Sequence, residues 1–291
     1  MLKKKIIALL CVLCCSLKIT ASACTLFAAT GDNFVQGGGT LVAKNRDWYP
    51  GHQELKVVHP PHGYAYYGLF SGKSATFNAA GVNEKGLFVA MSTASSIPQK
   101  ERRSYPVFKS TEGLRTNEYL LRYYASVDEV LAAQAIWSEP VNFIVADSKK
   151  VAYIEVAPGN AERGIRVETK GILFHTNHYV EDNTLEFNKK IGPSSSIRYD
   201  RVKDLLTNHD GKFTLPDFVT ISQDQNDGPD HSLYRLGSKP TGVSTVANFI
   251  VYLPPVGSPL IYVKYRAEAN EQGQEMVTGV ENLDSLLNAK I

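Results

Sequence analysis

The sequence predicts an α+β fold in which β-sheets pack face to face and helices cover their outer surfaces. Segments typical of strands dominate both halves of the 291-residue chain, and helical patterns occur between them in separate places. No internal repeat, low-complexity stretch or linker divides the chain. We therefore expect one domain over residues 24–291, preceded by a leader over residues 1–23.

The first predicted elements are strands separated by tight turns. Residues 25–29 are short and mostly apolar, and residues 39–45 follow a glycine turn at 37–39. The stretch "AAGVNEKGLFVAMST" predicts a turn and a strand, with the tight connection at Asn83–Gly86. The first third of the mature chain is therefore expected to be mainly β-structure.

Helices and further strands alternate along the rest of the chain. Ser126 and Glu129 fit a capping box, which predicts where the second helix begins. Periodicity predicts helices over 117–125, 127–135, 196–208 and, more weakly, 215–221 and 281–288. Apolar runs predict a hairpin over 141–147 and 151–156, a strand over 172–176, and a final hairpin over 243–253 and 260–265.

The N-terminus has the three-part pattern of a secretory signal peptide. Lysines precede an apolar run at residues 6–17, and Ala21 and Ala23 occupy positions −3 and −1 relative to Cys24. The run is shorter than the roughly 20 residues that span a bilayer. We expect cleavage after Ala23, export to the periplasm or the medium, and no stable membrane insertion afterwards. An uncleaved anchor is the alternative.

The charge of the chain argues against binding to nucleic acid. The formal net charge is +2, and losing the four lysines of the leader, which has no acid, brings it to −2. Neither value gives the basic surface that a nucleic-acid-binding protein needs. We expect a small-molecule partner and leave the oligomeric state open, a homo-oligomer included.

Cys24 is the one cysteine that remains after the predicted cleavage. An exported thiol without a partner in its own chain is tolerated, paired with another molecule, lipidated or reactive. Cleavage would give this residue a free α-amine, whose reference pKa of about 7.7–8.0 suits a base near neutral pH. The thiol is the strongest side-chain nucleophile, so one residue would supply both attacking atom and proton acceptor. Ala21, where lipid-anchor signals carry an aliphatic residue such as leucine, speaks against lipidation.

A catalytic Cys24 requires partners elsewhere in the chain. It needs a group to hold its amine, a donor to the oxyanion and a cation near sulfur. Asp47 follows a predicted strand, Asn177 ends another, and Arg198 lies in the first turn of a predicted helix. Each has a plainer explanation when taken alone, as a turn residue or a solvent-facing arginine.

Five segments in order resemble a known group of enzymes. They are "CTLFAA", "GTLVAKNRDW", "NAAGVNEKGLFVA", "HTNHY" and "SSSIRYDR". In this order, and over the chain from Cys24 to about Tyr265, they resemble the cysteine N-terminal nucleophile hydrolases. More narrowly, they resemble the choloylglycine hydrolase and isopenicillin N acyltransferase-like linear amide C–N hydrolases.

The resemblance implies a four-layer αββα sandwich and a role for each matching residue. Cys24 matches the nucleophile, and Asp47 matches the acid that orients the α-amine. Asn177 matches the oxyanion asparagine, and Arg198 matches the arginine close to the nucleophile. The implied reaction cleaves a linear amide through a thioester, with neither a metal nor a cofactor.

Two positions depart from the bile-salt and penicillin V branch of this group. Lys44 stands where that branch has arginine, and Thr93 where it has asparagine. A lysine does not offer the same donor fork as an arginine. A backbone N–H near Thr93 is the expected second oxyanion donor. The segment "HTNH" favours the acyltransferase-like branch.

Substrate contacts are expected from Thr93 and from an aromatic cluster that includes Tyr66 and Phe70. For these two rings, packing in the core is an equal alternative to lining an acyl pocket. His175 and His178 are three residues apart and would point to opposite faces of a strand, so we expect no shared metal.

These expectations add up to an exported amidase that acts on an N-acyl small molecule. An acyltransferase of the isopenicillin N type and a non-enzymatic exported lipoprotein or binding protein remain the alternatives. The sequence leaves open whether the substrate is a bile-salt conjugate, penicillin V, an acyl-homoserine lactone or an N-acyl amino acid.

Overall fold

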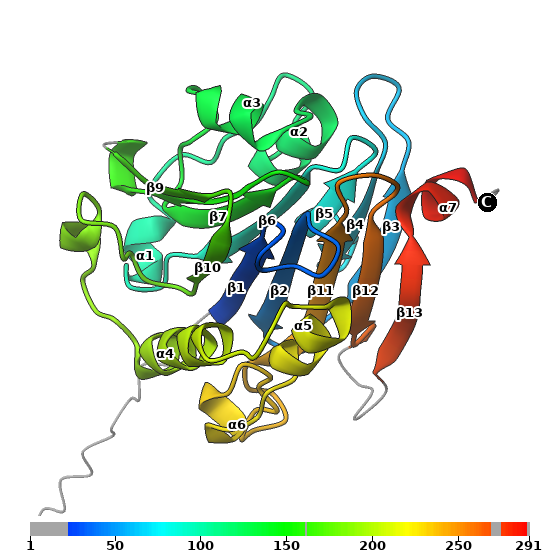
Figure 1. Cartoon of the computed structure of the whole chain (residues 1–291). Coiled ribbons are helices and arrows are strands. Elements are labelled where there is room, and N and C mark those ends of the chain that lie inside the picture. The colour runs from blue at the N-terminus through cyan, green and yellow to red at the C-terminus, as the bar shows by residue number, and fades with distance from the viewer. Residues whose placement is uncertain (1–22, 161, 269–274, 290–291) are drawn as a thin grey trace, which may run out of the picture.

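The computed structural model describes residues 23–160, 162–268 and 275–289. Two antiparallel β-sheets lie face to face, and helices cover the outer surface of each sheet (Figure 1). This is a four-layer αββα sandwich, so the fold predicted from the sequence is confirmed. The predicted signal peptide lies outside the described residues, apart from Ala23, and it stays a prediction.

The first sheet contains the first and the last strand of the described chain. Its strand order is β10-β1-β2-β11-β12-β13, and all neighbours are antiparallel. A Cβ at Gly39, which has a φ of +76°, would lie 2.2 Å from the carbonyl oxygen of Leu253, so this turn requires glycine. The strands are β1 (Ala23–Thr30), β2 (Thr40–Trp48), β10 (Gly171–His175), β11 (Ser244–Leu253), β12 (Leu260–Tyr265) and β13 (Met276–Asn282).

The second sheet is a meander in which each strand pairs with the next along the chain. The predicted connection at Asn83–Gly86 and the predicted 141–156 hairpin are both present. Its strands are β3 (Gln53–Val58), β4 (Tyr66–Ser71), β5 (Phe77–Asn83), β6 (Phe88–Thr93), β7 (Val141–Ala146), β8 (Val151–Val156) and β9 (Arg163–Glu168). The sequence did not predict β3, β4, β9 or β13. Of these, β3, β9 and β13 carry many partly or fully exposed residues.

Each of the five predicted helices is present. The helices are α1 (Gln99–Arg102), α2 (Thr116–Tyr123), α3 (Val127–Ala132), α4 (Pro193–Thr207), α5 (Leu215–Ser222), α6 (Gly228–His231) and α7 (Leu283–Asn288). Of these, α3 is shorter than predicted, and the two short helices α1 and α6 were not predicted. Ser126 caps the helix over residues 127–132 by accepting a hydrogen bond from the Glu129 backbone N–H, as expected, while the Glu129 carboxylate accepts from the N–H of Ala125 rather than from that of Ser126. Among the described residues, no helix has the length and apolar content needed to cross a membrane.

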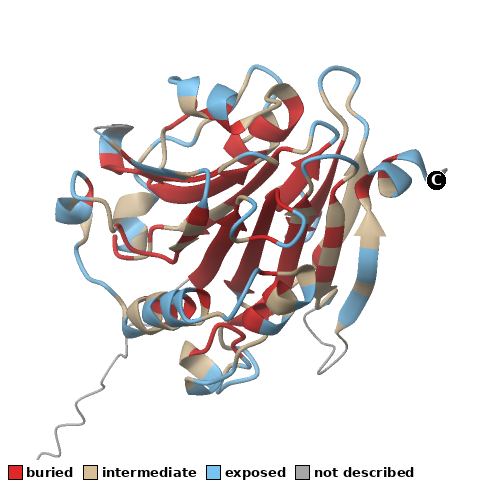
Figure 2. Cartoon of the chain, in the orientation of Figure 1, coloured by how far each residue is buried: buried red, intermediate tan, exposed pale blue. Residues whose placement is uncertain are grey.

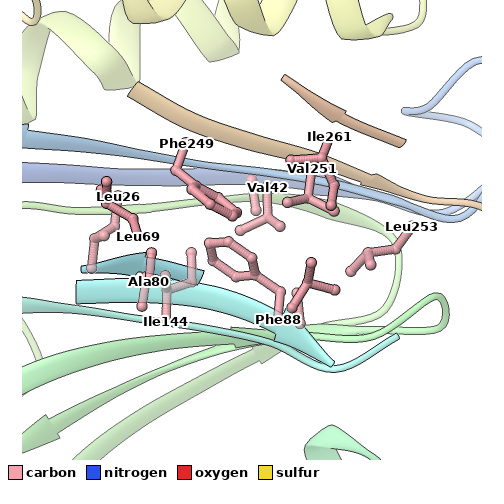
Figure 3. Close-up of a cluster of buried hydrophobic side chains, with 14 of the residues drawn as sticks. Leu26, Val42, Leu69, Ala80, Phe88, Ile144, Phe249, Val251, Leu253 and Ile261 are labelled. Carbon is pink, nitrogen blue, oxygen red and sulfur yellow. The ribbon is translucent and has the colours of Figure 1, made fainter. Parts of the chain in front are cut away.

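The main core lies between the two sheets. Figure 3 shows Leu26, Val42 and Phe249 of the first sheet facing Leu69 and Phe88 of the second. Because strand side chains alternate, the opposite faces of the same strands pack against helices. The central strands are therefore buried on both sides, as their colour in Figure 2 shows. This burial places any polar residue of β1 or β2 in a protein interior.

Candidate active site

Cys24 lies at the start of β1, on an edge that the neighbouring strand does not cover. β10 pairs with β1 only from Leu26, which faces His175, and then turns away. The backbone of Cys24 therefore needs other partners, and it finds them in two side chains. Its N–H donates to Oδ1 of Asn177 at 2.8 Å, and its carbonyl accepts from Nη1 of Arg198 at 2.6 Å. Asn177 and Arg198 thus take the place of a continuing strand.

The same two side chains also hold each other. Nη2 of Arg198 donates to Oδ1 of Asn177 at 2.8 Å, and Nη1 donates to Oγ1 of Thr25 at 2.8 Å. Because Oδ1 of Asn177 accepts from two donors, the orientation of the amide is fixed, and its Nδ2 donates to the Thr93 carbonyl at 2.9 Å. Burial lowers the pKa of Arg198 to about 10, which still leaves it cationic at neutral pH.

Arg198 differs in two ways from its expected place. It lies in the second turn of α4, because the helix begins at Pro193 rather than Ser196. Its guanidinium donates to the Cys24 carbonyl, to Asn177 and to the hydroxyls of Thr25 and Ser194, so it positions the nucleophile residue through its main chain. Its charge also acts on the thiol through space.

Asp47 lies within β2, rather than past its end, opposite Ala23. Its Oδ1 accepts from Oγ1 of Thr245 at 2.7 Å, while Oδ2 lies 3.8 Å from Nη1 of Arg235 and 4.0 Å from Nε of Arg198. Burial raises the pKa of Asp47, and the two arginines oppose that rise. No described residue hydrogen-bonds to its Oδ2, although that atom is buried.

The structure still has Ala23 attached to Cys24, and the Cys24 nitrogen contacts Asn177 rather than Asp47. The expected role of Asp47 in holding a free α-amine therefore stays a prediction, as do the catalytic roles of the other residues. What the fold establishes is their arrangement around residue 24.

Lys44 is a functional candidate that the sequence reading treated only as a departure from a pattern. It is buried on β2, where its Nζ donates to the Met91 carbonyl, and it lines the same cavity as Cys24, with whose thiolate its charge interacts. Burial lowers its pKa to about 8, and the negative charge of Cys24 opposes that shift. A lysine directly after the apolar run Leu41–Ala43 of a predicted strand was the signal available in the sequence, since buried lysines are rare.

A cavity of about 580 Å³ opens over these groups. Cys24, Lys44 and Arg46 line it from the first sheet, and Thr93 lines it as expected. The walls are strongly basic: among the lining residues Glu139 is the one carboxylate, against the lysines and arginines Lys44, Arg46, Lys73, Arg102, Arg103 and Arg115. Such a cavity suits a small molecule with a negative charge.

Tyr66 and Phe70 require a correction, because neither lines this cavity. Tyr67 and Leu69 of β4 face the core between the sheets, so the alternate residues Tyr66 and Phe70 point to the other side. There they pack beneath α2, and the Tyr66 hydroxyl donates to Glu118 at 2.9 Å. These two rings belong to the core alternative.

The two histidines have separate partners. His175 contacts Oε1 of Glu155 at 2.7 Å, and His178 contacts Oγ of Ser195 at 2.8 Å. In the described part of the chain, no group of three or more histidine, cysteine or acidic side chains could hold a metal ion.

Comparison with known proteins gives one family and several similar folds. The sequence model of the family described as acyl-coenzyme A:6-aminopenicillanic acid acyl-transferase matches residues 35–258, a range that begins after Cys24. None of the curated protein sequences matches the chain. The match to the family model confirms the family resemblance inferred from the sequence.

Two solved structures are similar at low sequence identity. A variant of conjugated bile acid hydrolase from Clostridium perfringens has a TM-score of 0.53 and 14% identity, over 89% of this chain and 96% of that one. A penicillin V acylase from Agrobacterium tumefaciens has a TM-score of 0.41 and 12% identity, over 83% and 82%. The first likeness supports the sandwich fold.

Proposed function

Because the chain belongs to the acyl-coenzyme A:6-aminopenicillanic acid acyl-transferase family, we propose that it is an exported, Cys24-dependent hydrolase of linear amides. Its substrate would be an N-acyl small molecule. The observation that carries the proposal is the position of Cys24 on the wall of a basic cavity. Lys44 lines the same cavity, and Asn177 and Arg198 hold the main chain of Cys24.

The first step is thiol activation. Removal of residues 1–23 would leave an α-amine on Cys24, within reach of Oδ1 of Asn177, which already accepts from that nitrogen. Oδ2 of Asp47, which accepts no hydrogen bond from a described residue, offers a second acceptor nearby. The amine takes the thiol proton, and the Lys44 ammonium stabilises the resulting thiolate.

The second step is acyl transfer to sulfur. The thiolate attacks the amide carbonyl, and the negative charge moves to the carbonyl oxygen. The Nδ2 group of Asn177 and a backbone N–H near Thr93 are the proposed donors to this oxyanion. The C–N bond then breaks as the α-ammonium returns its proton to the leaving amine. Water hydrolyses the thioester, releasing the carboxylic acid and the free thiol.

The test combines the mature N-terminus with turnover. Mass spectrometry should show a chain that begins at an unmodified Cys24, and amides should release free amine. Cys24→Ala should abolish release while leaving the far-ultraviolet circular dichroism unchanged. An extra residue kept before Cys24 should also inactivate the enzyme, because it converts the amine into an amide. A lipid on Cys24, or full activity in Cys24→Ala, would refute the proposal.

The family match favours an acyltransferase as the second candidate. In that reaction an acceptor amine, rather than water, attacks the thioester. Adding an amine to the assay and measuring a new amide by mass spectrometry distinguishes the two. Formation of free acid alone supports the hydrolase.

A further inference from the structure

Arg46 is a buried arginine of the cavity to which no described carboxylate is ion-paired. It is the direct partner of Cys24 in the β1–β2 ladder, so the two side chains leave the sheet on the same face. Its Nε donates to Oε1 of Gln53 at 3.0 Å and its Nη2 donates to Oγ of Ser71 at 2.9 Å, and both acceptors are neutral. Buried charges are ordinarily paired, because removing an unpaired charge from water is costly.

The Arg46 guanidinium is also held in a fixed orientation. Its central carbon lies 5.4 Å from the ring centroid of Trp48 and 5.6 Å from that of Phe77. The amide of Gln53 is itself anchored, since its Nε2 donates to the carbonyls of Gly51 and His52. No described residue accepts from Nη1 of Arg46, so a fixed donor edge is left for a ligand in the cavity.

Two negative charges act on Arg46, but neither gives its guanidinium a lasting ion pair. They are the Cys24 thiolate and Asp47. Asp47 lies on the helix side of the sheet, close to Arg198 and Arg235. The thiolate loses its charge when it becomes a thioester. During the acyl-enzyme stage Arg46 would therefore lack an anion, unless the bound molecule supplied one.

We propose that Arg46 determines specificity by binding an anionic group, a carboxylate in the simplest case, that the substrate carries close to the scissile amide. This inference rests on the proposed amide hydrolysis and adds the substrate class to it. Arg46 contacts the substrate through its Nη edge and leaves the bond-breaking steps to Cys24. Neutral amides of the same size are expected to be poor substrates.

Matched substrate pairs test the inference. One pair carries the charge on the amine side, as an N-acylglycine and its neutral glycinamide. A second pair carries it on the acyl side, as a glutaryl amide and a butyryl amide of one amine. For the wild type we expect kcat/KM to favour the charged member of at least one pair by roughly 10- to 100-fold, as a charge-assisted contact allows. The arm that shows the preference identifies the side.

Substitution of Arg46 gives the second readout. Arg46→Gln should bring the charged-to-neutral ratio of kcat/KM close to one, because the charged member loses its ion pair and the neutral member has none to lose. Arg46→Lys should keep part of the preference, because it keeps the charge and loses the fork. Arg163→Gln, an arginine outside the cavity, is the matched control and should behave as wild type. Equal losses on both members of a pair in Arg46→Gln would overturn the inference, as would a wild type without preference.

A binding measurement separates this inference from the proposed reaction. If the wild type released no amine from any substrate, the hydrolase proposal would fail. Calorimetric titration of Cys24→Ala with the same pairs would then still test Arg46. Tighter binding of the charged member, lost in a Cys24→Ala, Arg46→Gln double variant, supports the inference. Equal binding of charged and neutral members overturns it.

Discussion

Lys44 places a titratable cation in the cavity that Cys24 lines. Its side chain is buried, and its ammonium donates to the Met91 carbonyl and interacts with the charge of the Cys24 thiolate. Burial lowers its pKa from 10.5 to about 8, so the ammonium charge is present at neutral pH and is lost as the pH rises through about 8. An arginine at this position would keep its charge over the whole range.

We predict that Lys44→Met slows alkylation of Cys24. Removing the ammonium destabilises the thiolate, and iodoacetamide labelling at pH 7 should fall by about tenfold, the effect of roughly 1.4 kcal/mol. The ratio of wild-type to variant rates should approach one above a pH of about 9, because Lys44 of the wild type has then lost its charge. Labelling followed by intact-protein mass spectrometry measures both rates.

Lys44→Arg is the control for this prediction. It restores a cation that does not titrate, so its labelling should stay fast relative to Lys44→Met at alkaline pH as well. Equal labelling of wild type and Lys44→Met at pH 7 would show that the ammonium has no electrostatic effect on the sulfur.

At the scale of the element, the segment after β10 holds Asn177 in place. The Thr176 hydroxyl and the His178 ring both contact Ser195 of α4. The Ser195 hydroxyl also accepts from the backbone N–H of Asn177 at 3.1 Å. The network joins the end of a strand to the first turns of a helix. It thereby orients the amide that contacts Cys24.

His178 makes this network sensitive to acid. Burial lowers its pKa from 6.5 to about 4, and the charges of His175 and Arg198 add to the shift. Between these values the unfolded chain binds a proton that the folded chain does not. The free energy of unfolding should therefore fall as the pH drops from 6.5 towards 4, by about 2 kcal/mol at pH 5 from this group alone.

We predict that His178→Asn removes most of that loss, since an asparagine oxygen can replace Nδ1 without titrating. Urea unfolding at pH 7 and pH 5 measures the difference for wild type and variant. His62→Asn, in an exposed loop, should keep the wild-type difference. A His178→Asn variant with an unchanged pH dependence would contradict the assignment.

At the scale of the whole molecule, the two sheets are held together by the core between them. Phe249 of the first sheet packs against Tyr67 and Phe88 of the second, with ring centroids 6.1 Å apart in both cases. The two inner faces are buried against each other, with Leu283 and Leu287 of α7 completing this core. We therefore expect the sandwich to unfold as one unit.

We predict that Phe249→Ala lowers the free energy of unfolding by about 3–5 kcal/mol, through lost burial and the cavity left behind. Val280→Ala, on the exposed β13, should change it by less than about 0.5 kcal/mol. Urea unfolding followed by both tryptophan fluorescence and circular dichroism measures these values. Two separate transitions in the wild type would contradict a single cooperative sandwich.

Prediction from sequence was most accurate for elements with a local signal and least accurate for edge strands, and it also missed the buried strand β4, whose segment YYGLFS has a glycine within it. Buried strands such as β7 and β8 have continuous apolar runs, and capped helices such as α3 have local signals. β9 and β13 expose most of their side chains and have no such run. Their pairing depends on a neighbouring strand that a local window does not contain.

The sequence by itself indicated the sandwich fold and four of the candidate residues, Cys24, Asp47, Asn177 and Arg198, because burial patterns, caps and motifs are local properties of the chain. Only the tertiary structure decided which groups meet at Cys24. Asn177 and Arg198 reach its main chain because β10 ends early, and Lys44 and Arg46 share its face because of the β1–β2 register. The side chains of Tyr66 and Phe70 point away from the cavity because side chains alternate between the two faces of β4. Register and strand ends follow from long-range pairing, which distant parts of the chain must fix together.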